Sequence, residues 1–223
     1  MSWSKSDIEN VLDELEADFK NIPHKFFTEH DIHSHLHKLV EAELEKQGKR
    51  LVRSVDGQTT NLVHLEYPTP FRCDMSKHGF RVASDKDRTP RGRFYRRGHY
   101  DLVVLNPDFV RSHDLVIVSG KNYEKFCSAR DSINVTPLLW VCEILFGAHV
   151  EDDLPRNWMK FVEQDSKKVI ETLNYKVGKG IDFARCGSVL VFLGIASEKT
   201  VKLEEEIREF GSSQGFKIRF HSP

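Results

Sequence analysis

Three acidic side chains stand in strand-like apolar stretches, where an unpaired charge is costly. Glu143 is the only charged residue of the stretch 138–146. Asp101 opens the apolar run 102–105, and Glu66 closes a third such stretch. Burying a carboxylate without a partner costs several kcal/mol or keeps it protonated, so something must compensate these groups.

One compensation for these acids would be a metal ion. If the three strands are neighbours, the carboxylates converge on one hard cation such as Mg²⁺ or Mn²⁺, which takes oxygen ligands at about 2.0–2.6 Å. We then expect the carboxyl groups of Asp101 and Glu143 to lie within roughly 6 Å of each other. The alternative is that they are ordinary strand-end acids, which pair with arginine or cap backbone amides.

The segment from Arg88 to Tyr100, RTPRGRFYRRGHY, alternates arginines with aromatic residues. Its five arginines are Arg88, Arg91, Arg93, Arg96 and Arg97. Guanidinium groups bind phosphates and aromatic rings stack on bases, so the segment suits a nucleic acid and would deliver its backbone to Asp101. The alternative is solvated loop charge, because 33 Lys and Arg residues are balanced by 34 Asp and Glu residues and the net charge is −1.

Four histidines lie within eight residues, at positions 30, 33, 35 and 37. His33 and His37 are one helical turn apart, so both could face one zinc ion. No HExxH motif and no nearby cysteine supplies a third ligand. Imidazoles on a solvated helix face are the commoner origin of such a pattern, and zinc is the weaker interpretation.

The spacing of apolar residues predicts the elements that must position these groups. Helices are expected near 4–20, from about 28 to 47 with Thr28 as N-cap, near 157–173 and at 198–210. Strands are expected around 61–67, 98–105, 136–146 and 186–194, with short edge strands at 115–118 and 216–220. Pro68 and Pro70 are expected to end the first strand, and a polar segment to follow from 72 to 97. This order predicts an α/β fold with helices on both sides of a central mixed sheet.

Composition excludes several classes of protein. The chain has 223 residues, of which 30% are charged and 39% hydrophobic, as in a folded soluble domain. No apolar run approaches the roughly 18 residues of a membrane span, and the acidic N-terminus does not resemble a signal peptide. The four cysteines, at 73, 127, 142 and 186, lack CxxC spacing. We therefore expect a single cytoplasmic domain over 1–223 with free thiols and no membrane partner.

The order of five segments resembles the PD-(D/E)xK nuclease-like superfamily, in particular microbial members with a degenerate third motif. The segments are HDIHSHLHKLV (30–40), VHLEYPTPFR (63–72), RRGHYDLVVLNP (96–107), WVCEILFG (140–147) and EQDSKKVIETL (163–173). The resemblance covers roughly residues 28–194 and implies a restriction-endonuclease-like αβββαβ core. It also implies that Asp101 and Glu143 hold a metal that activates water, and that Glu29 is the acid that some members add on the first core helix.

The chain departs from this pattern where the superfamily has a lysine, two residues after the glutamate. That position is Leu145 here. A strand alternates its side chains with a period of two, so the missing lysine would share a face with Glu143 and steady the attacking water. We expect Lys168 to replace it from the following helix, with its ammonium within about 5 Å of Glu143. Tyr100 and Lys121 are weaker alternatives.

Two functions follow from these residues. The first is a Mg²⁺- or Mn²⁺-dependent nuclease in which Asp101, Glu143 and Glu66 bind the metal and Lys168 and Glu29 assist catalysis. The second is a nuclease-fold binding or scaffold protein without chemistry, which Leu145 favours. Acids retained inside apolar strands favour the first, because a core without a metal gains stability by losing them. The sequence decides neither the substrate nor the oligomeric state, and a homodimer is compatible with it.

Overall fold

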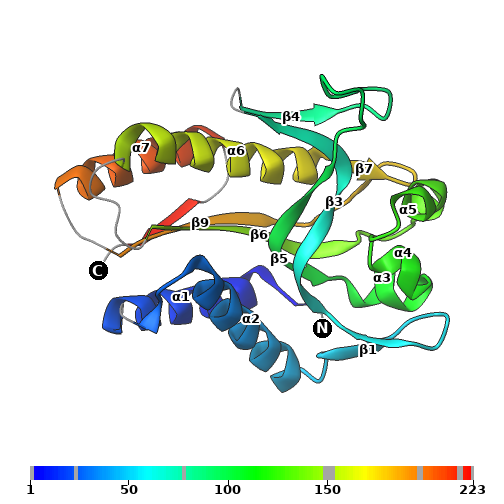
Figure 1. Ribbon diagram of the computed structural model, residues 1–223. Coiled ribbons are helices and arrows are strands. Elements are labelled where there is room, and N and C mark those ends of the chain that lie inside the picture. Colours follow the sequence, from blue (N-terminus) through cyan, green and yellow to red (C-terminus); the bar gives the residue numbers. More distant parts are fainter. Residues whose placement is uncertain are drawn as a thin grey trace.

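A six-stranded sheet separates two layers of helices (Figure 1). The computed structural model describes residues 3–22, 25–76, 79–147, 154–194, 198–214 and 218–221. Its helices are α1 (Lys5–Asn21), α2 (Glu29–Lys46), α3 (Pro107–Ser112), α4 (Leu115–Val118), α5 (Tyr123–Ala129), α6 (Leu154–Asn174) and α7 (Glu198–Gln214). Its strands are β1 (Leu51–Arg53), β2 (Thr59–Asn61), β3 (Val63–Ser76), β4 (Gly79–Ala83), β5 (Arg97–Leu105), β6 (Leu138–Gly147), β7 (Lys176–Val177), β8 (Ile181–Asp182), β9 (Gly187–Leu193) and β10 (Ile218–His221). No helix of these described segments is long and apolar enough to cross a membrane.

The large sheet is mixed, as the sequence predicts. Its strand order is β10-β9-β6-β5-β3-β4, with parallel pairing among β10, β9 and β6 and antiparallel pairing from β6 to β4. The four main strands expected from the sequence are confirmed as β3, β5, β6 and β9. Helices α1 and α2 cover one face, and α6 and α7 cover the other (Figure 1). Both faces of the central strand β6 are therefore covered, and this explains its nearly unbroken apolar run.

Helix α2 begins where the sequence predicts. The Thr28 hydroxyl accepts a hydrogen bond from the Asp31 amide, and the Asp31 carboxylate accepts one from the Thr28 amide. This capping box satisfies amides that the first helical turn leaves without partners. Ile32, Leu36 and Val40 then form the buried stripe that packs α2 against β3, β5 and β6. The cap and the stripe together fix which residues of the first turn face the sheet.

Strand β3 does not end at its prolines, so the expected end of this strand is wrong. Pro68 pairs with His99, the register with β5 then shifts, and β3 continues to Ser76 to form a hairpin with β4. Proline has no N–H to donate, and such residues are tolerated at bulges. At this bulge the Thr69 hydroxyl accepts a hydrogen bond from the Gly98 amide at 3.1 Å, in place of a backbone carbonyl.

Residues 115–118 form one helical turn, α4, and the expected edge strand is wrong there. The Val118 amide donates to the Asp114 carbonyl at 3.0 Å, and Gly120 ends the turn with φ of +62°. The Tyr67 hydroxyl donates to the Val118 carbonyl at 2.5 Å and so ties the turn to β3. A run of four apolar residues fits a strand or a helical turn equally, and this contact decides between them.

The ends of the chain pack against the sheet and each other. Strand β10 is the edge strand next to β9, as expected, although residues 216 and 217 of the expected range lie outside the described residues. Helix α1 packs beside α2 and contacts β10. The resulting order α2, β3, β5, β6, α6, β9 brings the middle of β5 and β6 close to α6 on one face and α2 on the other.

Candidate functional site

A buried ion pair joins β6 to α6. The Lys168 ammonium lies 2.6 Å from the Glu143 carboxylate, and their side chains are only 6% and 2% exposed. The same ammonium lies 3.5 Å from the Asp165 carboxylate. It also donates a hydrogen bond of 3.0 Å to the carbonyl oxygen of His99 in β5. The expected approach of Lys168 to Glu143 within about 5 Å is therefore confirmed.

Asp101 stands beside this pair on the neighbouring strand. Leu102 pairs with Cys142, so the register places Asp101 next to Glu143. The Asp101 carboxylate accepts a hydrogen bond of 2.6 Å from the Ile144 amide, and it is near enough to Glu143 for its charge to raise the pKa of that residue. The two carboxyl groups thus converge, as the apolar setting of both residues predicted.

The acids of this cluster hold their protons more tightly than usual. Burial raises the pKa of Asp101 to about 6, against the opposing effects of the Ile144 amide and the Lys168 ammonium. Burial likewise raises the pKa of Asp165 to about 6 and that of Glu143 well above its usual range. Burial alone would lower the pKa of Lys168, but the carboxylates of Glu143 and Asp165 outweigh it and raise that pKa. Lys168 is therefore a firmly charged cation among carboxyl groups that repel one another.

A second group of ligand atoms meets at Asp101 from the other side. Single ligand atoms of His33, Glu66 and Asp101 all lie within 4.8 Å of one another. Within the described part of the chain, this is the only group of three or more His, Cys, Asp or Glu residues arranged so that they could hold a metal ion. Asp101 thus belongs both to this triad and to the cluster around Lys168.

Glu66 reaches the triad from an unusual backbone conformation. Its φ is +53°, and it is the only residue other than glycine with positive φ in the described segments. A side chain in this left-handed region costs about 1–3 kcal/mol, and such residues gather at functional sites. The residue lies in β3 between two regular pairs with β5, Leu65 with Leu102 and Tyr67 with Tyr100. The expected metal ligand Glu66 is thus a neighbour of Asp101, at a position where the strand departs from regular geometry.

Glu29 lies at the start of α2 beside the same carboxyl groups. Its carboxylate is 3.8 Å from His33 Nε2, one helical turn away. Burial and the charge of Asp101 raise the pKa of Glu29, while a hydrogen bond from the Phe146 amide opposes them. Glu29 therefore stands at the mouth of the cluster, where the first core helix was expected to add an acid.

His33 is a candidate ligand that sequence reasoning assigned to a different site. Its Nε2 lies 3.8 Å from Asp101, is buried, and has no hydrogen-bond partner in the described structure. Burial and the neighbouring His30 lower the pKa of His33, so it is neutral near pH 7. His37 instead lies 3.6 Å from Glu41 and is not part of the triad. The helical spacing identified His33, but only the fold shows that its partners are acids of β3 and β5.

Two buried atoms of the site lack partners of their own. They are Glu143 Oε1 and His33 Nε2, both without a hydrogen bond among the described residues. An unsatisfied buried acceptor costs about 1–3 kcal/mol, and a bound cation would remove that cost. Carboxylate oxygens suit Mg²⁺ or Mn²⁺, and a neutral imidazole beside them favours Mn²⁺. The donor set therefore fits a divalent cation.

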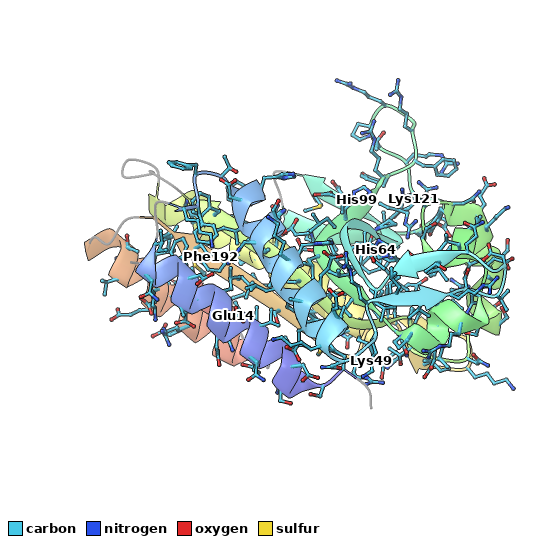
Figure 2. The ribbon with its side chains drawn as sticks, turned by 90° about the horizontal axis from the view of Figure 1, so that it is seen from below. Glu14, Lys49, His64, His99, Lys121 and Phe192 are labelled. Carbon is cyan, nitrogen blue, oxygen red and sulfur yellow. The ribbon has the colours of Figure 1, made fainter. Side chains whose placement is uncertain are left out.

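The other candidate residues for the lysine position lie elsewhere. The Tyr100 hydroxyl is buried and shares a 2.5 Å hydrogen bond with Thr172 of α6. Lys121 is exposed, and in Figure 2 it lies near His64 and His99. Leu145 is partly buried against the core. Lys168 is thus the lysine that the fold brings to Glu143.

The five arginines of the segment 88–97 divide into two groups. Arg97 lies partly buried and donates to the carbonyl oxygens of Thr69, Pro68 and Gly120, so we leave it out of the nucleic-acid interface. Arg88 lies against the Phe94 ring, 3.1 Å from its centroid. Arg91, Arg93 and Arg96 are exposed. In Figure 2 the loop after β4 stands away from the body, on the side where His99 and Lys121 lie.

Asp165 is a member of the cluster that lies in the segment 163–173, three residues before Lys168. The two residues are three apart on α6, so they share a helix face. That spacing is the signal in the sequence, but α6 carries many charged residues with similar spacing. Contact with Glu143 distinguishes this pair from the others.

Comparison with known proteins identifies no relative, so the site is interpreted from its geometry. No family model, no curated protein and no solved structure matches this chain.

Proposed function

We propose that this protein is a metal-dependent nuclease that hydrolyses phosphodiester bonds at the cluster around Asp101, Glu143 and Lys168. The observation that carries the proposal is the 2.6 Å contact between Lys168 and Glu143. It supplies the ammonium that the PD-(D/E)xK pattern needs, although Leu145 occupies the usual position. The element order α2, β3, β5, β6, α6, β9 supports the proposal, because it follows the αβββαβ order of a restriction-endonuclease-like fold.

A divalent cation fits the residues of this site. Asp101, Glu66 and His33 would hold it, and the free oxygen of Glu143 is a further donor. Bound there, Mg²⁺ or Mn²⁺ would lower the pKa of a water molecule and neutralise charge on the phosphate. Burial raises the pKa values of Asp101 and Asp165 although Lys168 opposes it, and a bound cation would compensate the solvation that the buried carboxylates lose.

The residues of the chain have separable roles in such a reaction. Lys168 is positively charged and would stabilise the negative charge that develops on the phosphate. Glu143, Asp165 and the His99 carbonyl hold its ammonium in one place from three sides. Glu29, half-exposed at the mouth of the cluster, would orient the incoming water or the phosphate.

The second candidate is a binding or scaffold protein that keeps this fold without catalysis. Leu145 favours it, because the usual lysine is absent. The charge of the cluster argues against it, because replacing buried ions by apolar residues often stabilises a protein. Three acids with little exposure, Asp101, Glu143 and Asp165, surround one lysine.

The experiment is a cleavage assay on single-stranded and duplex DNA and RNA, with Mg²⁺ or Mn²⁺ and with EDTA. We expect cleavage with the metals only, and a loss of at least 100-fold in Lys168→Ala. Lys167→Ala is the matched control, because Lys167 is its exposed neighbour on the same helix. Glu66→Gln is a second variant at an exposed position, expected to lose cleavage and to keep its melting temperature. Absence of cleavage by the unaltered protein on every substrate would overturn the nuclease and favour the scaffold.

A further inference from the structure

A cavity of about 480 Å³ opens beneath the arginine-rich loop, between the β3–β4 hairpin and residues 89–96. Pro90, Phe94 and Tyr95 supply apolar walls, and Arg91, Arg93 and Arg96 supply cations. Pockets of about 300–1,000 Å³ with apolar walls and a few charged groups are typical of small-ligand sites. The size and lining of this cavity suit one flat ring with a charged substituent.

The three arginines that line the cavity are free to bind an anion. Arg91, Arg93 and Arg96 form no ion pair with any described residue. Nearby Arg72 and Arg81 are instead paired, with Asp85 at 3.6 Å and with Asp87 at 3.3 Å. The acid that lines the cavity, Asp74, is 3.8 Å from Arg81, so the three unpaired arginines leave a net positive charge around the cavity.

The aromatic walls are held in place by Arg72, Arg81 and Arg88. The guanidinium carbons of Arg72 and Arg88 lie 5.1 Å and 3.1 Å from the centre of the Phe94 ring. That of Arg81 lies 5.4 Å from the centre of the Tyr95 ring. Such cation–π contacts order a loop that lacks a core of its own. Phe94 nevertheless stays 48% exposed, so part of its ring can contact a ligand.

The cavity is adjacent to the cluster around Lys168. Cys73 lines the cavity, and a Cβ atom at Gly98 would lie 3.2 Å from its sulfur and 3.6 Å from Cδ of Lys168. Strand β5 runs from this point to Asp101, and the five residue-to-residue steps from Arg96 to Asp101 span roughly 17 Å. A ligand in the cavity and a phosphate at Asp101 can therefore belong to one short stretch of chain.

We propose that this cavity binds a base of single-stranded nucleic acid, which stacks on Phe94 while Arg91 and Arg93 bind the flanking phosphates. The inference rests on the proposed nuclease function and names its substrate class. A base inside a duplex is stacked and paired, so only an unpaired nucleotide can turn its base into the cavity and against the Phe94 ring. A duplex would instead be bound along an extended positive surface, which a chain of net charge −1 is less suited to provide.

The test is equilibrium binding of fluorescein-labelled 15-nucleotide DNA and RNA single strands, and of the matching duplexes, by fluorescence anisotropy in EDTA. Omitting the metal separates binding from cleavage. We expect single strands to bind at least tenfold more tightly than duplexes. The double variant Arg91→Ala/Arg93→Ala should lose at least tenfold in affinity. Its plot of log affinity against log salt concentration should flatten by about 1.4, since two phosphate contacts are lost.

Variants of Phe94 distinguish the contribution of stacking to binding from the contribution of charge. Phe94→Leu should weaken single-strand binding about tenfold without changing the salt dependence, and Phe94→Trp should retain binding. Arg111→Ala is the matched control, because Arg111 is an exposed arginine on α3, outside the cavity. Melting temperatures of all variants should match that of the unaltered protein.

The outcomes distinguish this inference from the nuclease proposal. Equal or tighter binding of duplexes, or unchanged binding by Phe94→Leu, would overturn the pocket even if the protein cleaves nucleic acid. Selective single-strand binding that the pocket variants weaken would support it even if no substrate is cleaved. A difference in affinity between the DNA and RNA single strands shows whether the site prefers deoxyribose or ribose.

Discussion

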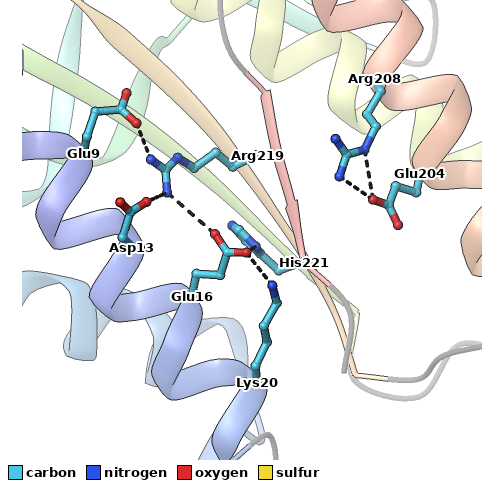
Figure 3. A network of polar contacts seen from close by, with 8 residues as sticks. All are labelled: Glu9, Asp13, Glu16, Lys20, Glu204, Arg208, Arg219 and His221. Atoms are coloured by element: carbon cyan, nitrogen blue, oxygen red, sulfur yellow. Dashed lines mark hydrogen bonds and ion pairs between the residues drawn. The ribbon is translucent and has the colours of Figure 1, made fainter.

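Two ion clusters, each around a buried cation, lie at the edge and in the middle of the sheet, and they differ in charge balance. In the joint between α1 and β10, the Arg219 guanidinium binds Glu9 and also Asp13, at 2.6 Å, and lies 3.7 Å from Glu16 (Figure 3). Lys20 and His221 lie 2.7 Å and 3.4 Å from Glu16. Although burial opposes it, the hydrogen bond from Lys20 and the nearby positive charge lower the pKa of Glu16.

The cluster around Lys168 has the opposite character. Three acids, Asp101, Glu143 and Asp165, surround a single lysine, and burial raises the pKa values of Asp101 and Asp165. Three acids in the α1–β10 joint, by contrast, face two permanent cations. The joint is closer to charge balance, and its acids can be hydrated, whereas the Lys168 cluster has fewer cations for its buried acids and suits a bound cation. Burial alone does not mark a functional site, but burial without charge balance does.

The largest expected effect comes from removing the lysine of the incomplete cluster. Lys168→Met should lower the free energy of unfolding by about 3–5 kcal/mol, because Glu143 is left buried without its partner. Arg219→Met should cost only about 1–2 kcal/mol, because Glu9 and Asp13 are 32% and 67% exposed and can be hydrated instead. Urea unfolding of both variants measures the difference.

A double variant sharpens this comparison. Lys168→Met/Glu143→Leu should recover at least half of the stability lost in Lys168→Met, since both charges are gone. If Lys168→Met lowers the free energy of unfolding no more than Arg219→Met does, the exposure of the partner acids does not determine how much each cluster contributes to stability.

The next effect concerns pH and belongs to the α1–β10 joint. Burial lowers the pKa of His221 from 6.5 to about 4, so the folded protein keeps it neutral while the unfolded chain takes up a proton near pH 6.5. Stability from this group is therefore present above pH 6.5 and lost as pH falls toward 4, by at most about 3 kcal/mol. Urea unfolding at pH 7, 6, 5 and 4 should show a shallower decline for His221→Gln. Parallel curves for the two proteins would contradict a buried neutral His221.

The smallest effect is the response to metal. MnCl₂ at 10 mM, compared with EDTA, should raise the free energy of unfolding by about 1–2 kcal/mol, because the ion binds only the folded protein. Glu66→Gln should lose this stabilisation, and Glu9→Gln in the α1–β10 joint should keep it. Thermal melts with and without metal measure both. A metal response that survives in Glu66→Gln would remove Glu66 from the ligand set.

Local patterns in the sequence determined most of the elements and several members of the site. Periodicity and the capping residue Thr28 predicted α2, and four apolar stretches predicted β3, β5, β6 and β9. Glu143 and Asp101 were identifiable because a charge in an apolar strand needs a partner. The substitution at Leu145 directed attention to Lys168. These inferences succeed because burial and capping depend on residues a few positions apart.

Only the tertiary structure decided which of these groups meet. Strand β3 continues past its prolines because Thr69 binds the Gly98 amide across the bulge, and residues 115–118 form a turn that Tyr67 secures. His33 meets Glu66 and Asp101 through the packing of α2 on the sheet, and Arg97 binds carbonyl oxygens in two distant segments. Spacing along the chain specifies the face on which a side chain lies, but strand register, bulges and helix packing set its partners. The excess of acids over cations near Lys168 therefore depends on the tertiary structure, because these acids come from α2, β3, β5, β6 and α6.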